Sequence, residues 1–359
     1  MTICLRRNLR IKTNEEFKRI LIIRLSGAGD IIHTMPLLGA LRKNYQGSFI
    51  AWLVSKKNKD VLAGHPYLDE IITFDKDNWS FKAVRNLILE LRRKKFDIVI
   101  DPQSQLRSGL IAFLSGAPIR LGFARGVAKE PNFIFMNRRV RPTPAERHNI
   151  DRDLSFARYL GIKRDEIDFS FYIGEENEAF VDGFLKEQVM DESTKLIGIS
   201  IGGSVPSKRW REENWAILID RLYELCDDIK PIILWGPGEE NSVKRIIDSA
   251  KIKPLVTPKT SWKQLAAFLK RCFLVIGNDS GPLHIGVAVG TKVIGLYGIA
   301  IWSPEKIGPY GPQNMAVRKE EDLDMLSCPK SGCRRCHRHD CMDLITPEDA
   351  LEAVKGYLV

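Results

Sequence analysis

The stretch that decides the fold is residues 19–30, which read RILIIRLSGAGD. Its first half is a short, largely β-branched apolar run, which predicts a strand buried in a parallel sheet. The glycine-rich segment 26–30 then predicts a tight turn, and residues 31–44 carry the apolar spacing of a helix. We place Pro36 in the first turns of that helix, where a missing N–H costs least. This order of strand, turn and helix is the opening unit of a parallel α/β domain.

The same alternation recurs along the chain in two sets. The predicted strands are 49–54, 70–74 and 96–101 in the first set and 195–201, 231–236, 273–277 and 292–297 in the second, and the predicted helices are 80–95, 212–226, 239–250 and one from about residue 281. Residues 129–150, which are rich in Arg, Pro and Asn, are predicted to be irregular. The pattern predicts an α/β protein with two Rossmann-like domains built on parallel sheets.

The domain boundaries follow from this reading. We assign residues 1–174 to an N-terminal Rossmann-like domain and residues 175–345 to a C-terminal one. Residues 346–359 form a closing helix, with Thr346 as N-cap and Pro347 at its first position. We expect that helix to pack back toward the N-terminal domain.

Length and composition narrow the class of protein. The chain has 359 residues, with 44% hydrophobic and 28% charged side chains, which is globular composition. No apolar run is long enough to span a bilayer, and the N-terminus lacks the apolar segment of a secretory signal. We therefore expect a cytoplasmic protein whose seven cysteines do not form a disulfide framework.

The charge is divided unevenly between the two halves. Residues 1–175 hold 31 basic and 19 acidic side chains, whereas residues 176–359 hold 24 and 26. A net charge of +12 in the first half indicates an anionic partner, such as nucleic acid, acidic lipid or an acidic glycan. The alternative is that surface lysines and arginines are merely unevenly distributed.

Three glycine-containing segments at strand-to-helix turns could carry chemistry. In the first, Asp30 lies near a helix N-terminus, where a carboxylate stays ionised and can act as a base; it could equally be a helix cap. The second, 202–210, combines glycines, hydroxyls and a lysine, as a phosphate site or a surface loop would. The third, 277–284, places Asp-Ser-Gly at a helix start, which suits an anion, or simply caps a core helix.

The chain resembles the ADP-heptose:lipopolysaccharide heptosyltransferases of glycosyltransferase family 9. The resemblance rests on segments 20–42, 98–123, 207–219, 274–298 and 308–312, which occur in the family's order. It implies the GT-B architecture, with two facing Rossmann-like domains, and an inverting glycosyltransferase that needs no metal or other cofactor for catalysis. The chain departs from the family pattern at Arg211 and at 299–300, near the expected donor site.

The resemblance also implies roles for individual residues. Asp30 matches the proposed catalytic base. The residues implied in donor binding are Ser204, Lys208, Glu239, Asp279, Ser280, Gly281 and His284. Those we place on the acceptor side are Ser26, Arg107, Arg120 and Arg125, within a wider basic cluster that adds Lys129, Arg138, Arg139, Arg141 and Arg147. The implied partners are a nucleotide-sugar donor, most simply ADP-heptose, and a lipid-linked anionic glycan of the lipopolysaccharide inner core. We therefore expect peripheral contact with the cytoplasmic face of the inner membrane, and no nucleic acid.

Four cysteines form a separate cluster. Cys328, Cys333, Cys336 and Cys341 fall within fourteen residues, which indicates a structural zinc site, although an iron–sulfur cluster, free thiols or a disulfide would use the same residues. Two short acidic patterns, 75–77 and 151–153, spell the D-x-D that binds metal in other glycosyltransferases, but neither joins the nucleotide motifs.

Other functions remain open from sequence. A relative of the same fold could use another nucleotide sugar or acceptor, or act as a nucleotide-sugar epimerase or hydrolase. A nucleic-acid binder would use the basic half, yet the chain lacks a recognised nucleic-acid-binding signature.

Overall fold

The computed structural model describes residues 16–75, 79–163, 166–188, 190, 193–298, 303–319 and 340–358. The chain divides into two compact units, residues 1–172 and 173–359. None of the helices in the described ranges is long and apolar enough to cross a membrane.

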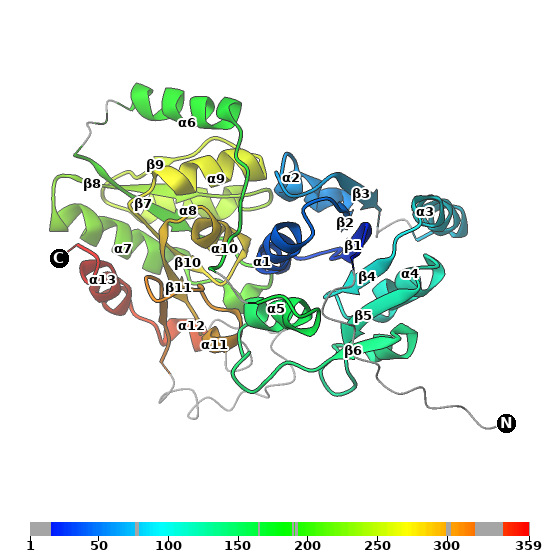
Figure 1. Ribbon diagram of the computed structural model, residues 1–359. Helices are drawn as coiled ribbons and strands as arrows, with labels where there is room; N and C mark the ends of the chain where they lie inside the picture. Colours follow the sequence, from blue (N-terminus) through cyan, green and yellow to red (C-terminus); the bar gives the residue numbers. More distant parts are fainter. Residues whose placement is uncertain are drawn as a thin grey trace. The chain divides into compact units, whose positions relative to one another are not determined.

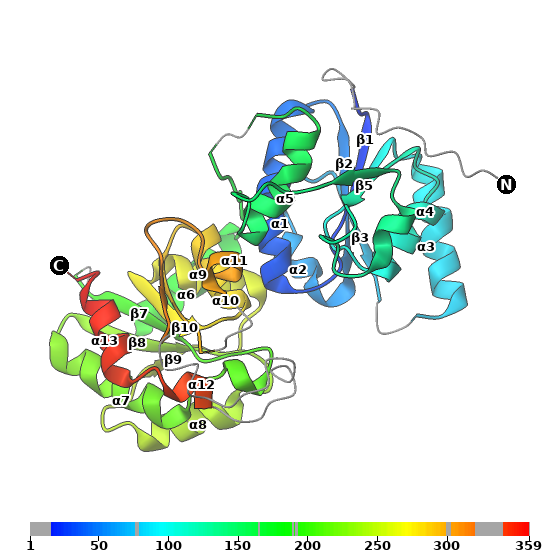
Figure 2. The same cartoon turned by 90° about the horizontal axis from the view of Figure 1, so that it is seen from below.

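The N-terminal unit is a six-stranded parallel sheet with helices on both faces (Figures 1 and 2). Its strands are β1 (Arg19–Ile23), β2 (Phe49–Ser55), β3 (Glu70–Phe74), β4 (Ile98–Asp101), β5 (Ile119–Phe123) and β6 (Arg138–Val140). Its helices are α1 (Ala28–Asn44), α2 (Lys59–Leu62), α3 (Phe81–Lys94), α4 (Leu106–Leu114) and α5 (Asn149–Tyr159), with short 3-10 segments η1 (Lys56–Asn58) and η2 (Pro131–Phe135). The strand order β3-β2-β1-β4-β5-β6 reverses direction between β1 and β4.

The C-terminal unit repeats this plan. Its strands are β7 (Lys195–Ser200), β8 (Ile229–Leu234), β9 (Leu255–Val256), β10 (Leu274–Asn278), β11 (Lys292–Leu296) and β12 (Met315–Val317). Its helices are α6 (Glu175–Glu187), η3 (Pro206–Lys208), α7 (Glu212–Leu225), α8 (Glu240–Ser249), α9 (Trp262–Arg271), α10 (Gly281–Ala288), α11 (Pro304–Ile307), α12 (Asp340–Asp343) and α13 (Pro347–Lys355). The order β12-β11-β10-β7-β8-β9 reverses between β7 and β10. The predicted α/β fold with two parallel sheets is confirmed.

Burial explains why these strands are so apolar. In β1 the four residues 20–23 have no exposed surface, because helices cover both faces of the sheet. One face packs against α3 and α4 through residues such as Leu21, Leu87 and Ile111. On the other face α1 and α5 pack against each other.

Two local expectations differ from the structure. Helix α1 already begins at Ala28, so Pro36 lies in its interior rather than in the first turns. Residues 129–150 are not wholly irregular, because Arg138–Val140 forms the edge strand β6, which pairs with β5. An arginine-rich strand of three residues has too little apolar pattern to be recognised in sequence.

The closing helix α13 starts at the predicted cap. Thr346 caps α13, and its side chain accepts a hydrogen bond from the backbone N–H of Asp349, as predicted. The buried face of α13, which includes Ala350 and Val354, belongs to the core of the C-terminal unit and packs against α7. That this helix also packs back toward the N-terminal domain stays a prediction.

Candidate active site

Asp30 lies in the first turn of α1, directly after the loop that follows β1. Gly27 precedes the helix with φ 83°, a left-handed conformation that favours glycine, and Asp30 occupies the third helical position. A Cβ atom added to Gly27 would lie 2.9 Å from Asp30 Oδ2, so the carboxylate folds back over the turn. Asp30 remains partly exposed, and Lys129 Nζ lies 3.7 Å from its Oδ2. The structure thus presents an accessible carboxylate at a helix N-terminus, as a base requires.

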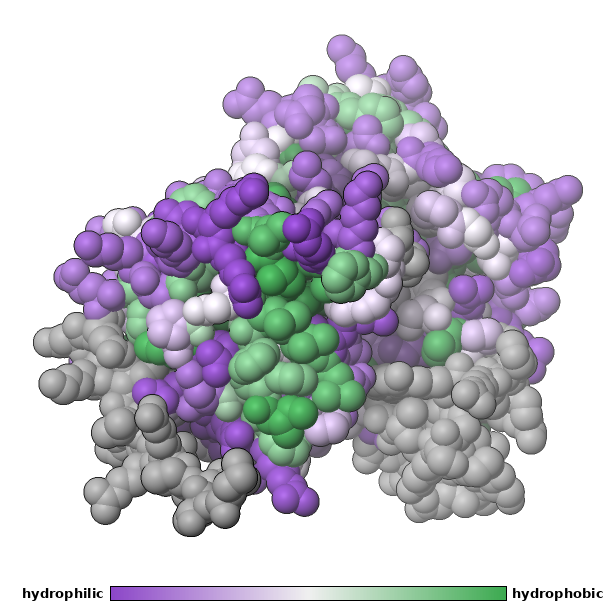
Figure 3. Space-filling view, turned by 90° about the vertical axis from the view of Figure 1, so that its right-hand side faces the viewer, coloured by the Kyte–Doolittle hydropathy of each residue, from purple (hydrophilic) through white to green (hydrophobic). Residues whose placement is uncertain are grey.

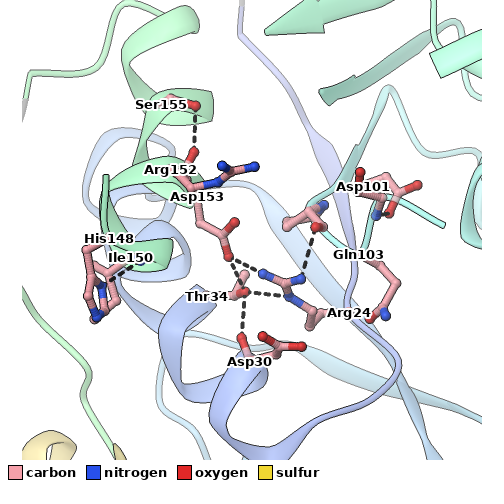
Figure 4. Close-up of polar contacts among 12 residues, drawn as sticks. Arg24, Asp30, Thr34, Asp101, Gln103, His148, Ile150, Arg152, Asp153 and Ser155 are labelled. Atoms are coloured by element: carbon pink, nitrogen blue, oxygen red, sulfur yellow. Dashed lines mark hydrogen bonds and ion pairs between the residues drawn. The ribbon is translucent and has the colours of Figure 1, made fainter. Parts of the chain in front are cut away.

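A buried ion pair supports this turn (Figure 4). Arg24 Nη2 donates to Asp153 Oδ2 at 2.5 Å, and both side chains are only 3% exposed. The hydroxyl of Thr34 accepts from Arg24 Nε at 2.9 Å and lies 2.6 Å from Asp153 Oδ2 and 3.0 Å from the Asp30 carbonyl oxygen. Burial raises the pKa of the Asp153 carboxyl, while the guanidinium opposes that shift. This network connects β1 and α5 to the first turn of α1.

A second anchor comes from the loop after β4. Gln103 Oε1 accepts hydrogen bonds from the backbone N–H groups of Leu25 at 3.0 Å and Ser26 at 3.4 Å. Its Nε2 donates to Gln105, the N-cap residue of α4. Gln103 therefore fixes the backbone just before the Asp30 turn, and it does so at the point where the strand order reverses, the usual ligand-binding edge of such sheets.

Asp101 holds the base of the same loop. Its carboxylate is fully buried and accepts from the backbone N–H of Ser104, the hydroxyl of Ser108 and the amide of Asn132. Burial raises the pKa of Asp101 to about 6, against the opposing effect of these hydrogen bonds. We singled out neither Asp101 nor Gln103 from sequence; the signal available was that Asp101 ends a predicted strand and Gln103 follows it.

The predicted acceptor-side arginines differ in exposure and in how far they are hydrogen-bonded within their own unit. Arg120 donates to the carbonyl oxygens of Phe135 and Ala117, so much of its hydrogen-bonding capacity is used within its own unit. Burial lowers the pKa of Arg120. Arg107 is exposed and lies 4.6 Å from the centre of the Trp79 ring. Arg125 is also exposed. Among the basic residues, Lys129 is one that the structure brings to Asp30.

In the C-terminal unit, Lys208 and Asp279 come together where the strand order reverses. Lys208 ends η3 in the loop after β7, and Asp279 follows β10, the neighbouring strand. Lys208 Nζ donates to Asp279 Oδ2, and both side chains are nearly buried. His284 Nε2 lies 3.8 Å from Asp279 Oδ1. Three residues predicted from two separate motifs thus form one charged cluster.

The helix N-terminus beside this cluster offers further donors. Ser280 is the N-cap residue of α10, and Gly281 is its first residue. The Ser280 hydroxyl is buried, and among the described residues it has no hydrogen-bond partner; the same holds for the Tyr297 hydroxyl. Burial, reinforced by Asp279, raises the pKa of Tyr297 far above its usual value. Free backbone N–H groups at a helix start, with a lysine nearby, can bind an anionic group.

Glu239 lies over the glycine loop after β7. Its Oε2 accepts from the backbone N–H of Gly236 at 2.8 Å, and a Cβ atom on Gly202 would lie 2.4 Å from its Oε1. Glycine at 202 therefore leaves room for the Glu239 carboxylate at this position. Burial raises the pKa of Glu239. Ser204 is exposed on the same loop.

Most of the predicted metal ligands lie outside the described residues. Cys328, Cys333 and Cys336 lie outside the described residues, and Cys341 is partly buried and forms no disulfide with another described cysteine. Within the described ranges, no group of three or more His, Cys, Asp or Glu is placed to hold a metal ion. Of the D-x-D patterns, 76–77 lies outside the described residues, and Asp153 is engaged by Arg24 and Thr34.

A family model, a sequence relative and two solved structures all relate the chain to glycosyltransferases. Residues 84–335 match the model of glycosyltransferase family 9 (heptosyltransferase). The lipopolysaccharide core heptosyltransferase OpsX of Haemophilus influenzae is 30% identical over 308 residues, which cover 85% of each chain. A family 9 glycosyl transferase from Veillonella parvula superposes with a TM-score of 0.79 at 29% identity, covering 96% of this chain and 97% of the other. Escherichia coli heptosyltransferase WaaC with ADP gives a TM-score of 0.73 at 23% identity, covering 94% and 99%.

Proposed function

Because the chain belongs to glycosyltransferase family 9, the heptosyltransferase family, we propose that it transfers heptose from ADP-heptose to an anionic inner-core sugar of lipopolysaccharide. The donor proposal is supported by Escherichia coli heptosyltransferase WaaC, which has the same fold and whose structure holds ADP. The acceptor proposal is supported by the OpsX relative, which is named for the lipopolysaccharide core, and by the basic N-terminal unit.

The observation that carries this proposal is the matching placement of charged groups at the carboxyl edge of each sheet. Asp30 follows β1, and Lys208 with Asp279 follows β7 and β10, in each case beside the reversal of strand order. In open parallel sheets this is where ligands bind. The first site offers a carboxylate, and the second offers a cation and a helix N-terminus, which are the groups that glycosyl transfer with inversion requires.

In the proposed mechanism, Asp30 removes the proton from the attacking hydroxyl of the acceptor sugar. Arg24, Thr34 and Gln103 hold the backbone of its turn, so the carboxylate needs little reorganisation. The oxygen attacks the anomeric carbon while the bond to the diphosphate breaks, and the configuration inverts.

The leaving nucleoside diphosphate gains negative charge in this step. Lys208 and the N–H groups at the start of α10 would bind it, and the unpartnered Ser280 hydroxyl would add a hydrogen bond. Since Lys208 is paired with Asp279, the diphosphate would have to share this cation or take it over. Glu239 would contact the ribose. Transfer needs no catalytic metal in this proposal.

We place the enzyme at the cytoplasmic face of the inner membrane, where a lipid-linked acceptor would be held.

A structural zinc ion would be bound by Cys328, Cys333, Cys336 and Cys341, because thiolates are the preferred ligands for such sites.

The test is Asp30→Asn, assayed with ADP-heptose and a heptose-free inner-core acceptor. We expect turnover to fall by about 10²–10⁴-fold, because general-base catalysis is lost, with ADP binding unchanged in calorimetry. Glu90→Gln, at an exposed acidic residue on α3, is the matched control. Retention of half the turnover, or a loss of ADP affinity, contradicts the role of Asp30. Release of free sugar without acceptor would instead identify a hydrolase.

A further inference from the structure

The N-terminal unit carries an exposed apolar surface that the proposed transfer does not use. Its most exposed members are Phe81 at 86%, Ile134 at 60% and Phe113 at 50%, with Trp79 and Leu106 near 40%. We call this the α3–α4 surface, after the helices that carry most of it. Figure 3, which views the side of the molecule where α3 and α4 lie, shows an apolar band bordered by hydrophilic side chains. Exposed apolar patches of this kind usually mark an interaction site.

Helix α4 is apolar on its outer side as well as its inner side. Ile111 and Ala112 are buried against the sheet. Leu106, Leu110 and Phe113 follow the spacing i, i+4 and i+7, so they share one face, and they are exposed or only partly buried. A helix that is hydrophobic all round is normally buried, whereas the outer face of α4 remains accessible.

Contacts join α3, α4 and η2 into one continuous surface. At one end the guanidinium of Arg107 lies over the Trp79 ring, just before α3. At the other end Arg92 Nε donates to the carbonyl oxygen of Leu114 at 2.8 Å. Phe113 contacts Phe135 of η2, with ring centres 5.9 Å apart. These contacts place α3, α4 and η2 next to one another, although more than fifty residues separate Phe81 from Ile134 in sequence.

The same segment is strongly basic. Residues 79–141 contain 13 Lys and Arg but only four Asp and Glu, a net charge of +9 in a chain whose total is +10. Arg85, Arg93 and Arg139 are among the exposed members. Two exposed acidic residues, Glu90 and Glu130, lie in the segment, and Glu130 accepts from the backbone N–H of Leu106.

We propose that the α3–α4 surface binds the anionic phospholipid surface of a membrane. Apolar side chains can enter the boundary between headgroups and acyl chains, while the surrounding arginines and lysines meet lipid phosphates. The high positive charge distinguishes this partner from a second copy of the chain, whose identical surface would repel it.

The position of this surface fits the use of a membrane-held acceptor. Helix α4 begins at the carboxyl edge of the sheet, and its N-cap residue Gln105 is bonded to Gln103, which holds the backbone at Ser26. The surface therefore starts near the turn that carries Asp30. The role we give to membrane binding rests on the proposed transferase function, but the binding itself can be measured without any transfer reaction.

The experiment is sedimentation of the full chain with vesicles of 30% phosphatidylglycerol in phosphatidylcholine, compared with pure phosphatidylcholine. The double variant Phe81→Ser, Ile134→Ser should lower the partition coefficient by about tenfold or more, because two exposed apolar anchors are lost. Ile217→Ser with Ile252→Ser, at exposed positions of the C-terminal unit, is the matched control and should bind like wild type. Arg93→Gln should weaken binding at low salt, whereas Lys244→Gln on α8 should not.

Several outcomes would overturn the proposal. Failure of the wild type to bind anionic vesicles, equally strong binding to neutral vesicles, or a loss of binding in the matched control variants as large as that in the Phe81, Ile134 variant would each contradict the proposal. A change in molar mass of the Phe81, Ile134 variant in solution would assign the surface to self-association instead. Turnover with a water-soluble acceptor lacking lipid separates the two proposals: failure of wild type there contradicts the transferase function, not the membrane surface.

Discussion

Removal of the Asp153 carboxylate should destabilise the N-terminal unit severely. Asp153 accepts from Arg24 at 2.5 Å and lies 2.6 Å from the Thr34 hydroxyl, in a site where both charged side chains are 3% exposed. Asp153→Ala leaves the guanidinium buried with only the Pro102 carbonyl and the Thr34 hydroxyl as acceptors. Loss of one partner of a buried ion pair typically costs about 3–5 kcal/mol of unfolding free energy.

The assay is urea-induced unfolding of the full chain, followed by circular dichroism and tryptophan fluorescence. Trp52 reports on the affected region, since its indole donates to the Arg24 carbonyl. Because the chain has two units, two transitions are expected, and added ADP should move only that of the C-terminal unit. Asp248→Ala, at an exposed position on α8, should change stability by less than about 0.5 kcal/mol.

A double variant separates charge from packing. Arg24→Met with Asp153→Leu removes both charges, so it should recover most of the stability lost in Asp153→Ala. It should still have reduced turnover, because the hydrogen bonds that join Arg24 and Asp153 to Thr34 and so support the Asp30 turn are gone. A loss below about 1 kcal/mol in the single variant, or no recovery in the double variant, would refute the reasoning.

Three further predictions concern pH, donor binding and metal. The pKa of Asp101 is raised from 3.8 to about 6 in the folded chain, so the folded state binds this proton more tightly than the unfolded state. The unfolding free energy should therefore fall by about 3 kcal/mol in total as pH rises from about 3 to about 7, and Asp101→Asn should abolish that fall in urea titrations. Lys208→Ala should weaken ADP binding by about 1.5–3 kcal/mol and leave adenosine binding unchanged in calorimetry; equal losses would contradict a phosphate contact. A strong chelator, or Cys333→Ser with Cys336→Ser, should lower the melting temperature while turnover without Mg²⁺ persists. Fewer than about 0.2 equivalents of zinc or iron per chain, or strict Mg²⁺ dependence, would contradict this last prediction.

The sequence by itself determined the fold class and most elements. Apolar runs such as 20–23 and 274–276 predict buried parallel strands because helices on both faces leave no room for alternation. The Thr346 cap was equally readable, since its partner Asp349 is three residues away. These patterns involve residues close together in sequence, so they can be recognised without knowledge of the topology.

Tertiary structure alone decided how the candidate site is supported. Arg24 and Asp153 are 129 positions apart, and Gln103 reaches a backbone N–H 78 positions before it. Such pairs exist only because the strand order β1-β4 and the packing of α5 on α1 bring distant segments together. Sequence patterns marked Asp30, Lys208 and Asp279 as chemistry-bearing; burial and topology determined which partners hold them, because desolvation makes an unpaired buried charge too costly to keep.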